Sequence, residues 1–349
     1  MKPFYYGATT NFGDHMNSWL WPELIPDLLE REDDIRLIGI GSLLSRNLDM
    51  VAGRKVVFGT GSGYSSLPTP EQAANWDVFA VRGPLTAKYL GLPPEKAITD
   101  GAWLINRIPR YAAIPETREG TVFVPHWTSA AYGDWPRICA ESDISYVDPL
   151  WDCDTVFSKL ANAKLAIVES LHGAIIADYY RTPWIPVASP GRVLKYKWID
   201  WCQSLNLEYH PYMLPPSDYV DFRLQGFTPQ IASGVPEHIA VDPDTFDVRE
   251  TPSQPGKAGI IHRGKVKAKG VLRQGRGYAL KGVAQVRNSI FFRNWNKQQS
   301  EALQRYFDTL KTAEPYLSDD TIRATRIEQL NAAFDDMVAR YGTSTETSK

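Results

Sequence analysis

The residues best suited to chemistry lie at Glu169–Gly173, where an apolar run that predicts a buried strand turns into a predicted helix. A helix N-terminus offers unpaired backbone N–H groups and a partial positive charge to an anion. Ser170 can cap the helix or donate to an anion, Gly173 lets a ligand approach the backbone, and His172 can carry a proton near neutral pH. The stretch is therefore a candidate anion and proton-transfer site. A satisfied histidine beside an ordinary capped helix is the structural alternative.

Arg82 lies at a similar corner, between an apolar strand pattern and Gly83-Pro84. Its guanidinium suits bidentate binding of phosphate or carboxylate, although an arginine in a surface turn is the plainer interpretation. The "GTGSG" loop at 59–63, with Gly61 and Ser62, resembles a phosphate-binding loop. It lacks the Walker lysine and the dinucleotide-binding spacing, so its signal is weak.

Two short motifs place an acid beside a glycine near predicted strand ends. "NFGD" begins at Asn11 and ends at Asp14, and Asp100 belongs to "TDGAWL". Each aspartate could serve as a base or hold a sugar hydroxyl, and each could equally form a turn. The cysteines and histidines show no metal-ligand spacing, so we expect no metal site.

The elements that must position these residues alternate between strand and helix. Strands are predicted at 2–7, 34–44, 55–64, 76–81, 121–127, 144–149, 165–170 and 183–188. Most end in small or turn residues before a helical pattern, which is typical of parallel βα units that bind ligands beyond the strands' carboxyl ends. We therefore predict an α/β protein with two doubly wound, Rossmann-like domains.

The predicted organisation follows from these patterns. It comprises an N-terminal domain at 1–110, a second domain at 118–210, an irregular Pro-rich connector at 211–256 and a basic and helical C-terminal extension at 257–349. Within the extension, residues 277–295 have helical spacing. A terminal helix starts near Ser318, its expected cap, and ends at Gly342.

Composition limits where the protein works and with what. The 349 residues, 43% apolar, allow about two domains, and the three cysteines are too few for a disulfide framework. No signal-peptide pattern or apolar run of about 18 residues is visible, so we expect a cytoplasmic protein. Residues 251–300 carry 11 Lys and Arg and no acid. This block predicts docking of residues 257–297 on an anionic membrane surface, or else a solvated face packed on the acidic body. Nucleic acid is not expected, because no recognised nucleic-acid-binding fold accompanies the charge.

Taken in order, "NFGD", "GIGS", "GTGSG", "VRGPLTAKYLG", "TDGAWL" and "ESLHGAIIADYYRTPWIPV" resemble the polysaccharide pyruvyl transferase family, in particular its succinoglycan-type members. The similarity spans about residues 1–207. It implies a fold like that of GT-B glycosyltransferases, with the site in a cleft between the domains. It also implies phosphoenolpyruvate as donor, without a further cofactor, and a sugar acceptor, expected to be a lipid-linked oligosaccharide at the inner face of the plasma membrane. The product would be a pyruvate ketal.

The resemblance also assigns residues. Arg82 falls on the family's anion-binding arginine, His172 on its histidine, and Lys197 on a lysine that starts a family helix. Many members have arginine where this chain has Ser170, so either Arg192, Lys195 or Lys197 supplies the missing cation or the donor sits differently.

In the mechanism that fits these residues, His172 either protonates the methylene carbon of the donor or donates to its phosphate, and Asp14 or Asp100 accepts the sugar hydroxyl's proton. Two alternatives remain at this point. One is a GT-B nucleotide-sugar glycosyltransferase, and the other is a non-catalytic assembly protein of exopolysaccharide synthesis.

Overall fold

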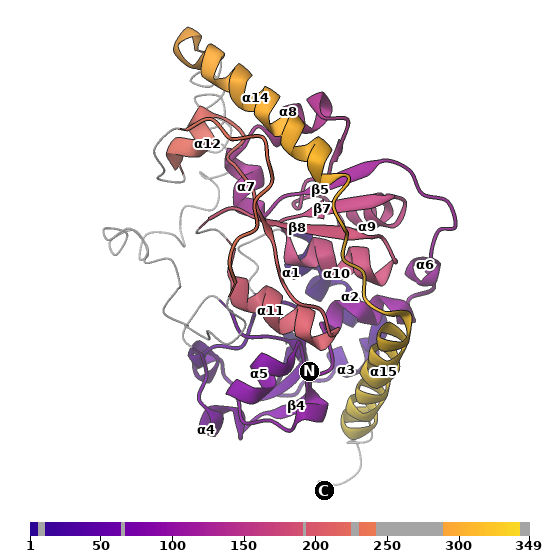
Figure 1. Cartoon of the computed structure of the whole chain (residues 1–349). Coiled ribbons are helices and arrows are strands. Elements are labelled where there is room, and N and C mark those ends of the chain that lie inside the picture. The colour runs from indigo at the N-terminus through magenta and orange to yellow at the C-terminus, as the bar shows by residue number, and fades with distance from the viewer. Residues whose placement is uncertain (6–10, 64–66, 191–192, 225–229, 242–288, 343–349) are drawn as a thin grey trace, which may run out of the picture.

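The computed structural model describes residues 1–5, 11–63, 67–190, 193–224, 230–241 and 289–342. They form two parallel β-sheets with helices on both faces, which confirms the predicted α/β class (Figure 1). The first sheet has the order β1-β2-β3-β4 and the second has the order β6-β5-β7-β8-β9.

The first sheet is built in chain order. Its strands are β1 (Lys2–Phe4), β2 (Ile35–Ile38), β3 (Arg54–Thr60) and β4 (Asp77–Val81). The helices around it are α1 (Phe12–His15), η1 (Met16–Ser18), α2 (Leu20–Leu24), α3 (Pro26–Leu29), η2 (Arg46–Met50), α4 (Pro70–Ala73), α5 (Pro84–Tyr89), η3 (Pro94–Lys96), η4 (Gly101–Arg107) and α6 (Pro109–Ala112).

The second sheet reverses its order once. Its strands are β5 (Thr121–Val124), β6 (Ser145–Tyr146), β7 (Leu165–Val168), β8 (Trp184–Ala188) and β9 (Tyr212–Met213). Its helices are α7 (Trp127–Tyr132), α8 (Trp135–Glu141), α9 (Cys153–Ala161), α10 (Leu171–Tyr179), α11 (Lys195–Ser204) and α12 (Tyr219–Leu224). Since β6 and β7 lie on opposite sides of β5, the chain order reverses between β5 and β7, and such a switch point is the usual ligand site in open α/β sheets.

Side chains alternate between two apolar layers on each sheet. On β3, Val56 and Phe58 belong to the large central core, whereas Val57 belongs to the core on the opposite face. On β5, Val124 joins the central core and Phe123 faces away from it. Both sheets are therefore buried on both faces, which explains why their strands read as continuous apolar runs.

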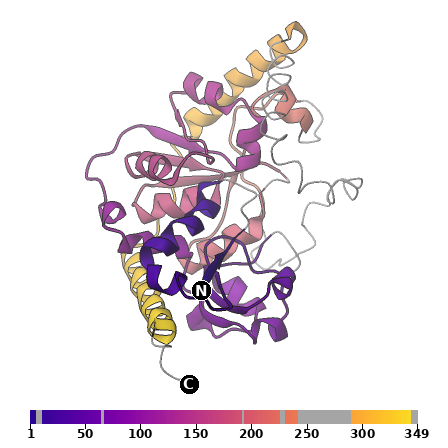
Figure 2. The same ribbon diagram turned by 180° about the vertical axis from the view of Figure 1, so that it is seen from behind.

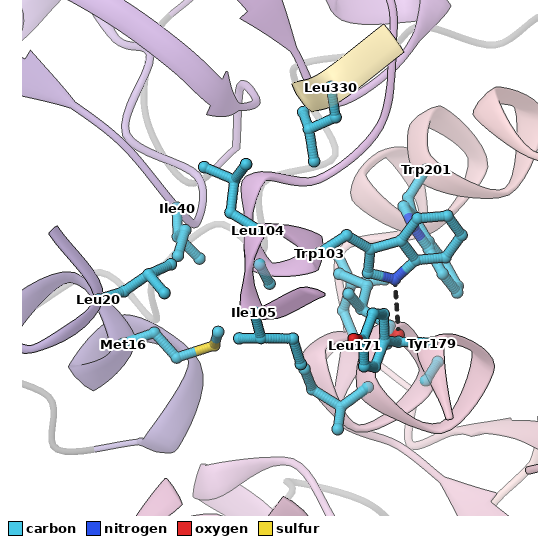
Figure 3. Packing of buried hydrophobic residues seen from close by; sticks show 14 of the residues in the cluster. Met16, Leu20, Ile40, Trp103, Leu104, Ile105, Leu171, Tyr179, Trp201 and Leu330 are labelled. Atoms are coloured by element: carbon cyan, nitrogen blue, oxygen red, sulfur yellow. Dashed lines mark hydrogen bonds between the residues drawn. The ribbon is translucent and has the colours of Figure 1, made fainter. Parts of the chain in front are cut away.

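The central core is shared by the two sheets. Figure 3 shows Ile40 and Met16 from the first half and Leu171 and Tyr179 from α10 gathered around η4. In η4, the Trp103 Nε1 donates to the Ile175 carbonyl oxygen of α10 at 2.9 Å, drawn as a dashed line. This shared layer holds the carboxyl ends of the two sheets close to each other.

The C-terminal helices pack on different sheets. Leu303 and Phe307 of α14 (Ile290–Leu310) join the outer core of the second sheet. Phe334 of α15 (Asp320–Gly342) makes an edge-to-face contact with Phe58 of the first, with ring centroids 5.9 Å apart. Both views show α15 alongside the first sheet and α14 extending from the opposite end (Figures 1 and 2). The helical extension thus belongs to the two cores.

Some sequence predictions need correction. Ser318 does not cap α15, because its N–H and hydroxyl donate to the buried Asp178 carboxylate. Asp319 performs this role, since its carboxylate accepts from the N–H groups of Thr321 and Ile322 at 2.8 and 3.2 Å. The strand β9 and helix α12 lie within the segment expected to be an irregular connector. Two-residue strands are too short for a periodic signal, which is why the sequence did not reveal β9.

Of the helix predicted at 277–295, residues 277–288 lie outside the described part of the chain. Across the described ranges, no helix has both the length and the apolar character needed to span a membrane.

Candidate active site

A buried carboxylate ties together three strand ends at the switch point of the second sheet. Glu169 follows β7, and its two oxygens accept from the backbone N–H of His126, after β5, at 2.8 Å and of Ser189, after β8, at 3.1 Å. Because each oxygen is bonded to a different neighbouring strand end, Glu169 fixes the frame from which α10 departs.

Ser170 caps α10, which is one of the two roles predicted for it, the other being donation to an anion. Its Oγ accepts from the Gly173 N–H at 3.3 Å. A Cβ on Gly173 would lie 3.3 Å from the Val124 side chain, so this glycine lets α10 pack closely on β5. The expectation that Gly173 opens the backbone to a ligand therefore needs correction, because its N–H is bonded to the cap and its open side faces a strand.

His172 lies under α1, which comes from the other half of the chain. A Cβ on Gly13 would lie 1.9 Å from the His172 Nδ1, and the Phe12 ring meets the imidazole edge-to-face at a centroid distance of 6.2 Å. The His172 Nε2 is buried and has no hydrogen-bond partner among the described residues. A buried polar atom in this state is costly unless a ligand, water or proton-transfer partner uses it.

Four ionisable residues meet here, and we call them the strand-end site: Asp14, Asp100, His172 and Lys197. Burial lowers the pKa of His172, the positive charges of Lys197 and Arg82 add to this effect, and the carboxylates of Asp100 and Asp14 oppose it. Near neutral pH the imidazole is consequently neutral in the free protein.

Asp100 is fully buried and only half satisfied. Its Oδ1 accepts from the Ala102 N–H at 2.9 Å and caps η4, whereas its Oδ2 is buried without a partner among the described residues. Burial raises the pKa of Asp100, against the lowering effect of the His172 charge. Burial thus disfavours the charged form of both Asp100 and His172, while the charge of each favours ionisation of the other.

Asn11 serves Asp14. Its Oδ1 accepts from the Asp14 N–H at 3.0 Å, and its Nδ2 donates to the Asp14 Oδ2 at 2.6 Å. The Phe12 N–H donates to the Pro149 carbonyl oxygen of the second half at 2.8 Å. The four residues of α1 thus bring an oriented carboxylate from the first half to the histidine of the second.

Arg82 lies beside the strand-end site, in contact with the residues that follow β2 and β3. It is fully buried and forms an ion pair with Asp200 of α11. Gly61 gives room to the guanidinium, because a Cβ there would lie 2.4 Å from the Arg82 Cζ, and the Ser62 carbonyl oxygen accepts from the Arg82 Nη2 at 2.9 Å. The "GTGSG" loop therefore surrounds an arginine in this structure, where a phosphate cradle was expected.

The three candidates for the missing cation differ in position. Lys197 is 8% exposed, and its Cδ lies 3.4 Å from the Cβ position of Gly63. The Lys195 Nζ donates to the Ala240 carbonyl oxygen at 3.1 Å, and Arg192 lies outside the described residues. Of the two described lysines, it is Lys197 whose charge acts on His172.

Sequence reasoning included Glu169 in the candidate stretch without giving it a role, and it missed His126 and Asp200. Glu169 and His126 form the bond between strand ends, and Asp200 anchors Arg82. Asp200 did leave a signal, because a single acid between tryptophans 198 and 201 requires a buried partner. His126 has no motif, and only the pairing of β5 with β7 reveals its place.

Within the described residues, no group of three His, Cys, Asp or Glu side chains could hold a metal ion. The ionisable groups of the strand-end site are one ammonium, two carboxylates and one imidazole.

The two parallel sheets define a parallel α/β protein, and the polar residues at the switch point of the second sheet are its candidate ligand site. Over 227 residues the chain is 38% identical to the succinoglycan biosynthesis protein ExoV of Rhizobium meliloti (strain 1021), a match that covers 65% of this chain and 72% of that protein. The chain therefore belongs to the succinoglycan-type polysaccharide pyruvyl transferase family. No protein-family model and no solved structure matches it.

Proposed function

We propose that the protein transfers the enolpyruvyl unit of phosphoenolpyruvate to a sugar of an exopolysaccharide repeat, forming a pyruvate ketal and releasing phosphate. Family membership favours this reaction over nucleotide-sugar glycosyl transfer and over a non-catalytic assembly role. The observation that carries the assignment to a site is the unpartnered His172 Nε2 at the switch point, within reach of the charges of Asp14, Asp100 and Lys197.

The first chemical step is a proton transfer. His172 gives a proton to the methylene carbon of the donor, and the double-bond electrons form the new C–H bond, which leaves an oxocarbenium-like C2. The donor's negative charges favour the protonated imidazole, so its binding offsets the effect of burial on the pKa of His172. Lys197 would hold the donor's anionic groups.

The remaining steps build the ketal. One sugar hydroxyl adds to C2, and its proton passes to Asp14 or Asp100 and back to His172. The bond from C2 to the phosphate oxygen then breaks, with its electron pair leaving on phosphate. The neighbouring hydroxyl adds to C2 and closes the ring, and its proton leaves with the phosphate. Positioned acid and base groups typically contribute about 10²–10⁴-fold to such steps. The scheme uses neither a metal nor a cofactor beyond the donor.

The proposed architecture has two Rossmann-like domains, 1–110 and 118–210, that face each other across a GT-B-like cleft. The shared core and the position of α1 over His172 support a site between the two sheets.

The decisive experiment supplies phosphoenolpyruvate and a succinoglycan-type oligosaccharide to the purified protein. We expect phosphate release that depends on the glycan, and a product heavier by one pyruvate less one water in mass spectrometry. Calorimetry of donor binding in buffers of different ionisation enthalpy should report proton uptake. Hexose transfer from a UDP-sugar would assign the protein to glycosyl transfer instead, and no reaction with either donor would favour an assembly role.

We also propose that the protein acts in the cytoplasm, at the inner face of the plasma membrane, on a lipid-linked acceptor. The first turn of α14 supports membrane docking, because Ile290 and Phe291 are 74% and 87% exposed and exposed Arg293 and Lys297 follow. Such an apolar and basic end suits an anionic lipid surface. Residues 257–288 of the predicted docking segment lie outside the described residues.

Vesicle co-sedimentation can test the docking. The double variant Ile290→Ser, Phe291→Ser should bind phosphatidylglycerol vesicles less than the unmodified protein. Met50→Ser, which removes an equally exposed apolar side chain elsewhere, should bind normally. Equal binding by all three proteins would exclude this end of α14 as an anchor.

A further inference from the structure

Arg82 uses its donors to hold the protein together. Its Nε donates to the Asp200 Oδ2 at 3.2 Å, its Nη1 to the Ser42 Oγ at 2.9 Å and the Gly41 carbonyl oxygen at 3.3 Å, and its Nη2 to the Ser62 carbonyl oxygen at 2.9 Å. A guanidinium has five N–H donors, so these four bonds leave little capacity for a ligand. Arg82 therefore links the carboxyl ends of β2 and β3 to α11.

Asp200 is equally occupied. Besides Arg82, its Oδ1 accepts from the Thr86 N–H at 2.9 Å, and its Oδ2 accepts from the Thr86 hydroxyl at 2.7 Å. A Cβ on Gly83 would lie 1.9 Å from the Asp200 carbonyl oxygen, so the "RGP" glycine is required for α11 to approach α5. One carboxylate thus fixes the position of α11 against the first sheet.

Lys197 lies three residues before Asp200 on α11, and residues so spaced share one side of a helix. Its stem packs near Gly63, and its charge reaches His172. Any rotation of α11 that separates Asp200 from Arg82 would therefore also carry the Lys197 amine away from the strand-end site.

We propose that Arg82 and Asp200 are positioning residues, which fix α11 so that Lys197, and not Arg82, binds the anionic group of the donor. This inference rests on the proposed function for the identity of the donor. The "RGP" motif then has a structural role at the site. Asp200, although it is fully buried and does not touch the donor, affects donor binding through the position of Lys197.

A double-mutant cycle tests the proposal. Lys197→Met should raise KM for phosphoenolpyruvate about tenfold or more, and Asp200→Asn should raise it in the same direction, because misplacement by about 1 Å can cost up to about 100-fold. The combined variant should resemble Lys197→Met alone, since the two changes remove one interaction. Additive effects, or a lower KM in Asp200→Asn through an Arg82 released toward the donor, would overturn it.

Two further variants separate positioning from general damage. Thr86→Val replaces Asp200→Asn in the test if Asp200→Asn does not fold. It removes the hydrogen bond from the Thr86 hydroxyl to Asp200 but keeps the ion pair with Arg82, so it should raise KM by a smaller factor than Lys197→Met does. Asp178→Asn alters a carboxylate that is equally buried but bonded to Ser318 and Trp184, away from the strand-end site. Asp178→Asn should lower the free energy of unfolding and leave KM unchanged. If it also raises KM, the rise in Asp200→Asn reflects lost stability and not the position of Lys197.

Donor binding without turnover separates this inference from the proposed function. Calorimetry measures the affinity for phosphoenolpyruvate and for inorganic phosphate of the four proteins of the cycle: the unmodified protein, the two single variants and the combined variant. If the unmodified protein binds these anions but forms no ketal, the proposed function fails, and a non-additive loss of binding still supports positioning. If Lys197→Met binds both anions as tightly as the unmodified protein, the positioning inference fails, whatever the reaction.

Discussion

The corner after β4 and the corner after β7 resemble each other in sequence, yet they do different work. Each places a polar residue directly after a buried parallel strand and a glycine near the start of the following helix, Gly83 just before α5 and Gly173 in the first turn of α10. At the first corner, Arg82 and Asp200 satisfy each other and their neighbours. At the second, Glu169 is satisfied in the same manner, but the His172 Nε2 is not.

The difference lies in what remains unpaired after folding. A buried ion pair with all its hydrogen bonds made contributes to a fixed geometry, whereas a buried atom without a partner costs free energy that folding alone does not recover. The β4 corner is therefore the support, and the β7 corner is where chemistry is expected. The predictions below test this division, starting with the largest effect.

His172→Ala should lower turnover by about 100-fold or more, because it removes the proposed proton donor. Steady-state kinetics with phosphoenolpyruvate and the glycan acceptor measure this change. The folded state should persist, since the Nε2 gives up no bond, and circular dichroism checks this. Near-normal turnover would remove His172 from the mechanism.

Arg82→Met should cost about 3–5 kcal/mol of unfolding free energy, because it leaves the Asp200 charge buried and unpaired. Urea denaturation measures the loss. Combining it with Asp200→Asn should recover part of the stability, as the remaining charge is removed. If Arg82→Met keeps normal stability and only raises KM, Arg82 binds the donor and the comparison of the corners is wrong.

Gly13→Ala should lower turnover about tenfold to 100-fold, because a Cβ there would lie 1.9 Å from the His172 Nδ1 and must displace the ring or α1. Gly342→Ala is the matched control, since a Cβ at that position has no atom within 4 Å. Both variants can be compared by kcat and melting temperature. Equal activity of both would show that the contact of α1 with His172 has no part in catalysis.

Asp100→Asn should raise the melting temperature at pH 8 while lowering turnover. Burial raises the pKa of Asp100, so the folded protein holds this proton more tightly than the unfolded chain and loses stability as the carboxyl ionises. The gain from Asn should shrink as pH falls toward the unfolded pKa of about 3.9. Asparagine can still cap η4. Calorimetric scans between pH 5 and pH 8 on the two proteins provide the measurement, and a pH-independent difference would contradict the assignment.

Most of the fold could be predicted from sequence, because the long parallel strands are buried on both faces and appear as apolar runs. The corner from Glu169 to Gly173, the helix beginning at Pro84 and the helical C-terminus all follow from local patterns. The strand β9 did not, because two residues give no periodic signal, and Asp319 replaces Ser318 as the cap because the distant Asp178 carboxylate accepts from the Ser318 N–H and hydroxyl.

The sequence predicted which residues make up the candidate site, but it predicted the role of only some of them. The charges of Asp14, Asp100 and Lys197 do act on His172; the two aspartates and the histidine were named from their places near strand ends, and Lys197 from the family resemblance. Arg82 and Gly173 have other contacts than expected, because sequence shows that an arginine or a glycine stands at a corner but not what occupies the space beside it.

The sequence by itself determined the parallel α/β pattern, the family and the residue types at each strand end, since these depend on periodicity and on local backbone chemistry. Only the tertiary structure decided which polar atoms find partners. That outcome depends on α1, α5, α10 and α11, whose residues lie up to about 190 positions apart and meet through the core that the two sheets share. The same kinds of residue thus became a support at Arg82 and Asp200 and a candidate reactive site at His172.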